Sequence, residues 1–280
     1  MMRELTNTPD TAAKQAAARA GVTIRSLTEA DELIEVRRLC DTVWQSAQDR
    51  PLPQTLLRAL AKAGSYVAGA YDGDELVGFA IGFSGAPADD ALHSHITGVT
   101  ARMRGANVGF ALKVHQRAWA LRHGAAAITW TFDPLMRRNA YFNIGKLAAT
   151  PVEYLPDFYG PIPDIINAGD TTDRLLVRWD LRAPSVAAAC AGQSDHPAVT
   201  NGIVALDISA TGEPVPGRTD GRTLLIAVPD TIPRLRVADP PLARRWRTAV
   251  RETLTGLMSD GARITGFDRA GRYVLTTEDA

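Results

Sequence analysis

The 280-residue chain has only two cysteines, Cys40 and Cys190, which lie far apart and outside any metal-ligand spacing. This scarcity argues against a disulfide framework and fits a reducing compartment. Acidic and basic residues balance at 31 each, so no charge excess favours nucleic acid or an anionic membrane. No apolar run approaches the roughly 20 residues that span a bilayer, and the N-terminus lacks a signal-peptide core. We therefore expect a cytoplasmic protein with neither membrane nor nucleic-acid partner.

The composition, 45% hydrophobic and 22% charged, is typical of a soluble globular protein with a sizeable core. The order of apolar and polar segments predicts helices around a mixed, mainly antiparallel sheet, an α/β fold of the α+β type. Four regions are expected along the chain: an N-terminal tail or loosely held helix (1–21), a catalytic domain (22–183), an Ala-, Ser- and Gly-rich linker (184–200), and a smaller α/β extension (201–280) that packs on the first domain.

Local signals place most of the expected elements. A hairpin is indicated by the apolar segments 65–71 and 75–83, which are joined by Asp-Gly-Asp. Thr28 and Asp31 have the spacing of a capping box that opens a helix. The other expected strands are 22–27, 92–100, 125–132, 173–181 and 223–229, with a bent strand or hairpin at 264–277. The other expected helices are 53–64, 108–123, 133–149 and 240–262.

The stretch MRGANVGFALKVHQRAW (103–119) places an arginine and small residues directly before a helix-forming run. Gly105 and Gly109 carry no side chain that would hold a ligand away from the backbone. Asn107 belongs to the residue type that best tolerates a positive φ in place of glycine. Because the first N–H groups of a helix lack intrahelical partners, residues 104–109 predict a diphosphate site. The alternative is a loop that only turns the chain into a helix.

Two other phosphate-binding loops do not fit this stretch. A P-loop requires Gly-Lys followed by Ser or Thr, and no such sequence follows here. A dinucleotide-binding turn has a different glycine spacing and does not come after a hairpin. Any diphosphate site at this loop must therefore use another arrangement of main-chain amides.

The segment Arg104–Gly109 fits the pattern Arg/Gln-x-x-Gly-x-Gly/Ala, with Asn107 in place of the first glycine. The pattern resembles the acyl-CoA-binding motif of the GNAT (Gcn5-related) N-acyltransferase superfamily. The strings HSHITGV, WTFDPLMRRNAYFNIGKL and EYLPDFYG resemble one bacterial branch of predicted GNAT acyltransferases, and this resemblance covers residues 22–182. It implies a GNAT-like fold in which a hairpin is followed by strand, loop, helix, strand and helix.

The resemblance also implies the co-substrate, acetyl-CoA or another acyl-CoA, and its contacts. The pantetheine arm would pair with the backbone of the strand before the loop, and the following strand 125–132 would have to splay away from it. No metal is expected, because the neighbouring His93 and His95 have no third ligand close in sequence. The implied cofactor-binding residues are Gly98, Val99, Thr100, Arg104, Gly105, Ala106, Asn107, Val108, Gly109 and Asn139, the last of which could instead cap a helix.

N-acyl transfer needs a neutral amine, a polarised thioester carbonyl and a proton for the leaving thiolate. The superfamily often uses a tyrosine as the acid, but Ile144 occupies that position here. Tyr141, about one helical turn earlier, is our candidate acid, with packing between helix and sheet as its alternative role. His95 shares a strand face with His93 and is the candidate base, with a buried, backbone-bonded histidine as the alternative. Asp133 is expected to cap a helix rather than act as a base.

Several residues could bind the acceptor. Arg137 or Arg138 could clamp a carboxylate, carried by an amino-acid acceptor or by a dicarboxylic acyl group such as succinyl. Solvated surface arginines are the alternative. Tyr154 and Tyr159 are expected in the wall of the acceptor site or in a packed loop.

The C-terminal helix pattern, RRWRTAVRETL, interleaves Arg244, Arg245, Arg247 and Arg251 with apolar residues. This spacing is typical of a helix with one packed and one solvated face, so we expect a packing or homodimer helix and not a DNA reader.

Together these features predict an N-acyltransferase that moves an acetyl or succinyl group from CoA to the amine of a small molecule such as an amino acid. Acetylation of a protein or peptide is a second interpretation. A CoA-binding module without turnover is a third, because Ile144 replaces the usual acid.

Overall fold

The computed structural model describes residues 8–44, 52–86, 90–160, 169–193, 199 and 201–277. The helices are α1 (Pro9–Arg19), α2 (Ala30–Trp44), α3 (Gln54–Lys62), η1 (Ala101–Met103, 3₁₀), α4 (Val108–Arg122), α5 (Arg137–Ala140), η2 (Tyr141–Lys146, a π-helix), α6 (Pro184–Cys190), α7 (Ile232–Ala238) and α8 (Pro240–Ser259). The strands are β1 (Thr23–Ser26), β2 (Tyr66–Asp72), β3 (Glu75–Ser84), β4 (Ala91–Val99), β5 (Ala127–Phe132), β6 (Thr150–Leu155), β7 (Arg174–Asp180), β8 (Ile203–Ile208), β9 (Pro214–Pro216), β10 (Thr223–Ala227), β11 (Arg263–Phe267) and β12 (Arg272–Thr276).

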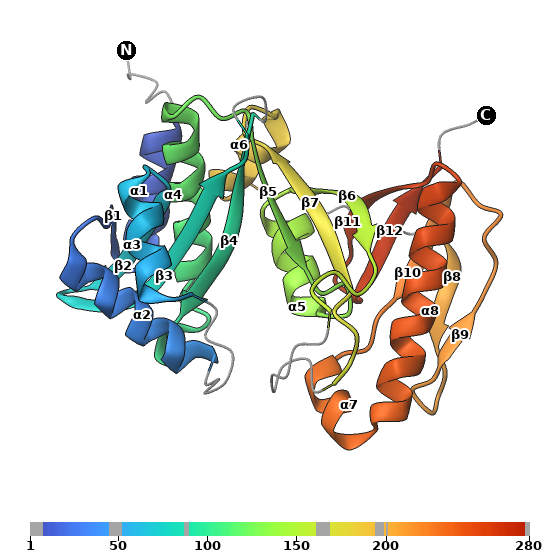
Figure 1. The fold of residues 1–280 in the computed structure, drawn as a ribbon. Coiled ribbons are helices and arrows are strands. Elements are labelled where there is room, and N and C mark those ends of the chain that lie inside the picture. Colours follow the sequence, from blue (N-terminus) through green and yellow to red (C-terminus); the bar gives the residue numbers. More distant parts are fainter. Residues whose placement is uncertain are drawn as a thin grey trace, which may run out of the picture. The chain divides into compact units, whose positions relative to one another are not determined.

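The strands form two sheets (Figure 1). The larger has seven strands in the order β1-β2-β3-β4-β5-β7-β6, and the smaller has five in the order β11-β12-β10-β8-β9. Pairing is mostly antiparallel, while β4 with β5 and β8 with β10 are parallel. The predicted fold class, a mixed and mainly antiparallel sheet with helices and a smaller C-terminal α/β part, is confirmed. The order hairpin, strand, loop, helix, strand, helix is also the one that the resemblance implied.

The chain divides into two compact units, and their limits differ from the predicted domain boundaries. The first comprises Met1–Trp130 and Asp180–Gln193, and the second comprises Thr131–Trp179 and Ser194–Ala280. The later part of the predicted catalytic domain therefore belongs with the C-terminal extension. The physical reason is packing, because β11 lies against β6 and η2, and α8 also contacts β6.

In the first unit, helices cover both faces of the β2–β4 sheet (Figure 1). A Cβ at Gly78 on β3 would meet Val108 and Leu112 of α4, which places α4 on that face. Phe79 points to the opposite face, where its ring meets that of Trp44 at the end of α2, with centroids 6.0 Å apart. Strand β4 therefore runs through the core, and its C-terminal end leads directly into the loop before α4.

The N-terminal region and the expected linker are both partly helical. A helix is one of the two forms expected for residues 1–21, whereas α6 corrects the interpretation of residues 184–190 as linker. Residues 9–19 form α1, whose small side chains Ala12, Ala13 and Ala16 are buried, and the helix packs on α4 and α6. Residues 184–190 form α6 with Val186 buried. The composition of an alanine-rich segment suggests a flexible chain. The small alanine side chains nevertheless let such a helix pack closely against its neighbours. Residues 194–198 and 200 of the expected linker lie outside the described residues.

Only one half of the predicted capping box is found, and it has a different partner, because the Thr28 hydroxyl donates to Glu29 and does not accept from the helix. The backbone N–H groups of Thr28 and Glu29 both donate to the Glu32 carboxylate at 3.1 Å, so Glu32 and not Asp31 closes it. Because α2 begins at Ala30, Glu32 is the residue in its first turn that reaches back to these donors.

In the second unit, the long helix α8 packs on β8 and β9 of the smaller sheet (Figure 1). Its apolar face buries Trp246, Val250 and Leu254 completely. The periodic apolar positions that predicted this helix are therefore its core face. No helix in the described part of the chain is long and apolar enough to cross a bilayer.

Candidate functional site

The loop between β4 and α4 has the backbone shape that its small residues predicted. After the 3₁₀ turn η1, Arg104 is extended and Gly105 has φ 92°. Asn107 adopts φ 62°, in the left-handed region, and is the residue from which α4 starts. The expectation that asparagine would supply the positive φ usually given by glycine is therefore confirmed.

The start of α4 is not capped by a side chain. Asn107 makes no capping hydrogen bond, and the first helical bond runs from the Ala111 N–H to the Asn107 carbonyl at 3.0 Å. The N–H groups of Gly105, Val108 and Gly109 meet no acceptor among the described residues. Uncapped N–H groups together with the positive end of the helix dipole favour an anion at this position.

Space lies in front of both loop glycines. A Cβ placed on Gly105 would have no atom within 4 Å, and one on Gly109 would meet only Val99 Cγ2 at 4.0 Å. Gly105 and Asn107 are exposed, while Val108 anchors the helix start in the core. The loop thus presents bare backbone to solvent, which is the surface that a diphosphate needs for close approach.

The two loop arginines have different surroundings. Arg102 pairs with Asp72 at 2.8 Å and Glu75 at 2.7 Å, so it ties the loop to the β2–β3 hairpin. Arg104 is exposed and makes no ion pair with the described residues. Its guanidinium is the positive charge at this loop that remains available to a phosphate.

Strand β4 carries an open edge toward the loop. It pairs with β5 over only three residue pairs, ending at His93 and Thr129, whereas its pairing with β3 continues to Val99. The early end of the β4–β5 ladder is the splay that the resemblance required. Thr100 follows, with its N–H bonded to the Val77 carbonyl at 2.9 Å and its buried hydroxyl unsatisfied within the described residues. Free backbone and an unpartnered hydroxyl both suit an amide-rich ligand such as pantetheine.

Gly98 is required by close packing. A Cβ at this position would lie 2.7 Å from Phe79 and 2.9 Å from Trp44, closer than any real Cβ contact. The strand backbone next to the open edge is therefore covered on one side by aromatic rings and on the other by α4.

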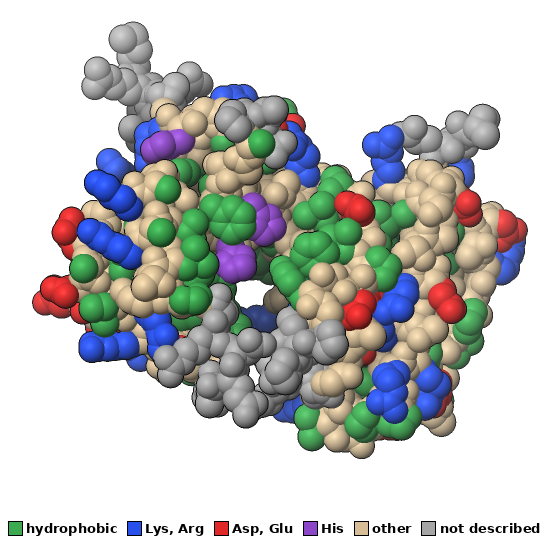
Figure 2. Space-filling view, in the orientation of Figure 1, with side chains coloured by type: hydrophobic (Ala, Val, Ile, Leu, Met, Phe, Trp, Pro, Cys, Tyr) green, Lys and Arg blue, Asp and Glu red, His purple; other side chains and the backbone are tan. Residues whose placement is uncertain are grey.

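His93 and His95 share one face of β4, as their spacing predicted. A β-bulge interrupts pairing at His95, since Ile96 opposes Ile81 while Ser94 opposes Gly82. Figure 2 shows histidine side chains side by side at the surface among hydrophobic side chains; the two rings lie 6.4 Å apart, each against Phe83. His95 is exposed, and partial desolvation lowers its pKa below the usual 6.5. A neutral, accessible imidazole can accept a proton at pH 7.

Lys113 is a buried cation that the sequence did not reveal. It is 3% exposed, donates to Ser94 Oγ at 3.0 Å and Gln116 Oε1 at 2.9 Å, and lies 3.6 Å from the Trp130 ring centroid. Burial lowers the pKa of its amine well below the usual 10.5. Helical periodicity places Lys113 on a face of α4 but cannot tell that α1 covers the far side of this helix.

The remaining predicted site residues lie in the second unit. Arg137 pairs with Asp230 and donates to the Ala270 carbonyl, so its guanidinium is already engaged. Arg138 and Asn139 are exposed. Tyr141 is half-buried at the first position of the π-helix η2, a distortion that is frequent at functional sites. Ile144, at the usual position of the acid, is buried.

The two predicted tyrosines differ in their surroundings. Tyr154 is 8% exposed, and its hydroxyl donates to Asp173 at 2.6 Å. Burial, with Asp173 beside it, raises the pKa of this phenol, so its role is packing within the unit. Tyr159 is 45% exposed and its hydroxyl lies 3.2 Å from Thr131 Oγ1. Of the two, only Tyr159 can contact a ligand without rearrangement.

A buried ion-pair network lies at the end of β5. Asp133 contacts Arg236 at 2.5 Å and Arg247 at 2.9 Å, and both arginines also contact Asp170 at 3.0 Å. These arginines hold the pKa of Asp133 at about 2 although burial alone would raise it. The Leu135 N–H also donates to Asp133 at 3.0 Å, but this bond closes a local turn. Helix α5 begins at Arg137 with Met136 as its N-cap and no capping side chain, so the predicted helix cap at Asp133 is wrong. Arg247 was expected on a solvated face and is instead 2% exposed, because acidic residues distant in sequence meet it.

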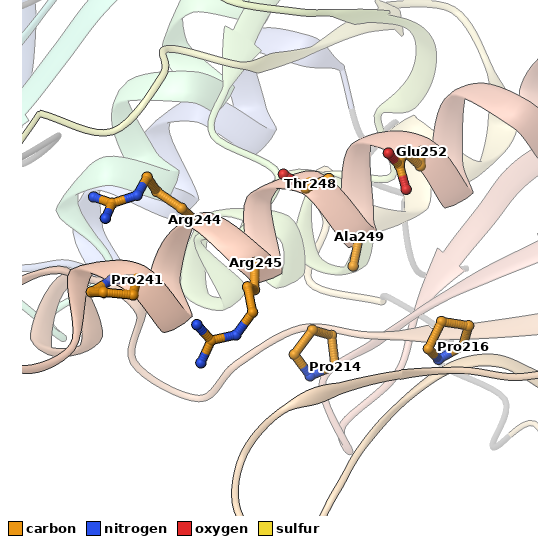
Figure 3. Close-up of a pocket in the computed structure, with 8 residues that line it drawn as sticks. All are labelled: Pro214, Pro216, Pro241, Arg244, Arg245, Thr248, Ala249 and Glu252. Carbon is orange, nitrogen blue, oxygen red and sulfur yellow. The ribbon is translucent and has the colours of Figure 1, made fainter.

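A groove in the second unit contains none of the predicted site residues. It has a volume of about 460 Å³ and runs between β9 and one face of α8 (Figure 3). Pro214 and Pro216 line one side, and Arg244 and Arg245 line the other. No group of three metal-ligating side chains is found among the described residues.

No protein-family model and no curated protein matches this chain. Solved structures similar to it include an acetyltransferase of the GNAT family from Streptococcus pneumoniae (12% identity, TM-score 0.46, 56% of this chain and 97% of that one). Others are yncA from Salmonella typhimurium, solved with its cofactor acetyl-CoA (16%, TM-score 0.48, 58% and 95%), and the ribosomal-protein-S18-alanine N-acetyltransferase of Escherichia coli (15%, TM-score 0.46, 58% and 95%).

Proposed function

We propose that this chain is an acyl-CoA-dependent N-acyltransferase acting on the amine of a small molecule. The observation that carries the proposal is the start of α4, which no side chain caps and where the Cβ positions of Gly105 and Gly109 face open space. Arg104, next to Gly105, makes no ion pair with the described residues. Main-chain donors of this kind suit a diphosphate, and coenzyme A carries one.

In this proposal the open edge of β4 receives the rest of the donor. The backbone of Gly98 and Val99 hydrogen-bonds the amides of the pantetheine arm, and the unsatisfied Thr100 hydroxyl takes a further polar contact. The N–H of Val99 is the proposed donor to the thioester oxygen, where negative charge develops during the reaction. Asn139 is a further candidate for the pantetheine amides.

The proposed reaction is direct attack. The neutral amine forms a bond to the thioester carbonyl carbon, the carbon–sulfur bond breaks, the amine loses a proton, and the thiolate takes one up. We assign proton acceptance to His95, whose lowered pKa supports a neutral ring at pH 7. We assign proton donation to Tyr141, in place of the tyrosine that Ile144 replaces.

The acyl group is acetyl or succinyl, and an amino acid is the proposed acceptor. Tyr159 and Arg138, both exposed, are the proposed acceptor contacts from the predicted set. Arg137 and Tyr154 are less suited, because Arg137 is paired with Asp230 and the Tyr154 hydroxyl is bonded to Asp173.

Thiol release tests the proposal directly. The protein is incubated with acetyl-CoA or succinyl-CoA and a panel of L-amino acids, and free CoA is measured against a matched lysine-containing peptide. We expect release that depends on both the donor and an amino acid, with less on the peptide. Calorimetry that detects no binding of CoA would overturn the proposal at its first step.

The buried Ile144 supports a second candidate, a module that binds CoA without turnover. The same two measurements separate the candidates. Tight CoA binding with no thiol release from any acceptor would favour the module, and amine-dependent release would exclude it.

A further inference from the structure

One arginine of the second unit stands apart from the paired ones. Arg174, the first residue of β7, places its guanidinium 5.1 Å from the ring centroid of Tyr159 and donates one hydrogen bond to the Asp173 carbonyl at 2.8 Å. The Tyr159 hydroxyl lies 3.2 Å from Thr131 Oγ1 at the end of β5. A guanidinium and two hydroxyls, from three separate segments, therefore gather at one place.

The acidic side chains near Arg174 are already used. Asp133 and Asp170 pair with Arg236 and Arg247, as described above. Asp173 pairs with Arg251, with contacts of 2.5 Å and 2.8 Å. Asp157 accepts from the Thr172 N–H at 3.0 Å and from the Thr172 hydroxyl at 3.2 Å. Each of these four carboxylates therefore has partners other than Arg174, which forms no ion pair with the described residues.

The surroundings of Arg174 increase the effect of its charge. The residue is half-buried, and desolvation lowers its pKa despite the attraction of Asp133. A partly desolvated cation gains more from a bound anion than a solvated one does, because water screens it less. Phe158, 47% exposed, meets the Tyr159 ring edge-on at 4.7 Å and adds an apolar wall.

We infer that Arg174, Tyr159 and Thr131 form a binding site for a substrate carboxylate. The inference rests on the proposed function and names the substrate class that this function would select. One unpaired guanidinium matches the single charge of a carboxylate, binds its two oxygens through a planar fork, and leaves the hydroxyls to complete the shell. The carboxylate can be carried by the acceptor, as in an amino acid, or by the acyl group, as in succinyl-CoA.

Paired substrates test the site. Wild type and Arg174→Gln are each assayed with two pairs of substrates. In the first pair the donor is acetyl-CoA and the acceptor is an L-amino acid or its amide. In the second pair the acceptor is an uncharged amine and the donor is succinyl-CoA or acetyl-CoA. We expect the substitution to lower kcat/KM about 50-fold for the carboxylate substrate and less than about threefold for its neutral match. Loss confined to the amino acid places the carboxylate on the acceptor, and loss confined to succinyl-CoA places it on the acyl group.

Smaller changes dissect the site. Arg174→Lys keeps the charge without the planar fork and should lose about tenfold. Thr131→Val removes one hydroxyl at constant shape and should lose about threefold. Arg178→Gln is the matched control, since Arg178 lies four residues further along β7 on the same face and outside the site. It should leave the carboxylate-to-neutral ratio unchanged.

Calorimetry with product analogues separates this inference from the proposed function. Wild type should bind N-acetyl-L-alanine or succinate, and Arg174→Gln should not, while both proteins bind CoA equally. If turnover is absent but this difference is found, the enzyme proposal fails and the site stands. Two results would overturn the site. One is a wild type that shows no preference for a carboxylate substrate or ligand over the neutral match. The other is a folded Arg174→Gln protein that keeps the wild-type preference for the carboxylate.

Discussion

Helix α4 in the first unit and helix α8 in the second differ in what their first free N–H groups meet. Helix α8 opens with two prolines, which lack an N–H, and the Asp239 carboxylate accepts from the Leu242 N–H at 3.0 Å. Helix α4 opens from a left-handed Asn107 with no capping side chain. Helix α8 therefore has a side-chain acceptor for its first free N–H group, and α4 has none. Of these two helix starts, only that of α4 leaves its N–H groups to an anion.

The difference also separates stability from binding. At α8 the capping carboxylate occupies the place that a ligand would take, so changes there should affect unfolding and not ligand affinity. At α4 no side chain caps the first N–H groups, so changes there should affect affinity more than unfolding.

The largest effect is expected from Gly109→Asp. A Cβ at this position has open space, so the protein should fold, but the carboxylate brings negative charge to the N–H groups that would hold the diphosphate. We expect CoA affinity to fall more than about 100-fold, or about 3 kcal/mol, by isothermal titration calorimetry.

The matched control is Gly109→Asn, which has nearly the same shape without the charge. It should retain a measurable part of the affinity. Equal CoA binding by the Asp variant and wild type would show that the donor binds elsewhere, and the transferase proposal would be lost with it.

Next in size is Tyr141→Phe, which separates donor binding from chemistry. If Tyr141 donates the proton, removing its hydroxyl should lower kcat about 30-fold while CoA affinity changes less than about twofold. Single-turnover thiol release and calorimetry on the same preparation measure the two quantities. An unchanged kcat would remove Tyr141 as the acid and assign the residue to packing.

Much of the first unit could be predicted from the sequence, because the residue patterns that specify its elements are local. The Asp-Gly-Asp turn predicted the β2–β3 hairpin, and small residues before an apolar period predicted the loop and α4. The positive φ of Asn107 followed from residue chemistry alone. Short-range rules of this kind need no knowledge of the rest of the chain.

Less of the second unit could be predicted from the sequence, because ion pairs between residues far apart in the chain organise it. Arg247 and Asp133 are 114 residues apart, and no period in either segment shows that they meet. Arg174 gave no motif at all, since its significance depends on which neighbouring carboxylates are already paired. The sequence could not decide between a tail and a helix at α1 for a related reason. Composition does not distinguish a helix face of small packed side chains from a flexible tail.

A smaller effect is expected when α4 receives the kind of cap that α8 has. Asn107→Asp keeps a residue type that tolerates the left-handed conformation and adds a carboxylate beside the free N–H groups. We expect CoA affinity to fall about tenfold, with thermal stability equal or slightly higher. Asn107→Gly, which suits the same φ without charge, should bind CoA as wild type does. Equal CoA affinities for the Asp and Gly variants would mean that a negative charge at this position does not affect CoA binding.

The smallest effect is expected from removing the cap of α8. Asp239→Ala leaves the Leu242 N–H without its acceptor, and loss of an N-cap costs about 1 kcal/mol of unfolding free energy. Asp239→Asn, whose amide oxygen can accept the same bond, should recover most of it in urea unfolding. CoA affinity should not change in either variant, because this helix start carries its own acceptor. A loss of CoA affinity in Asp239→Ala at unchanged stability would reverse the comparison and assign anion binding to α8.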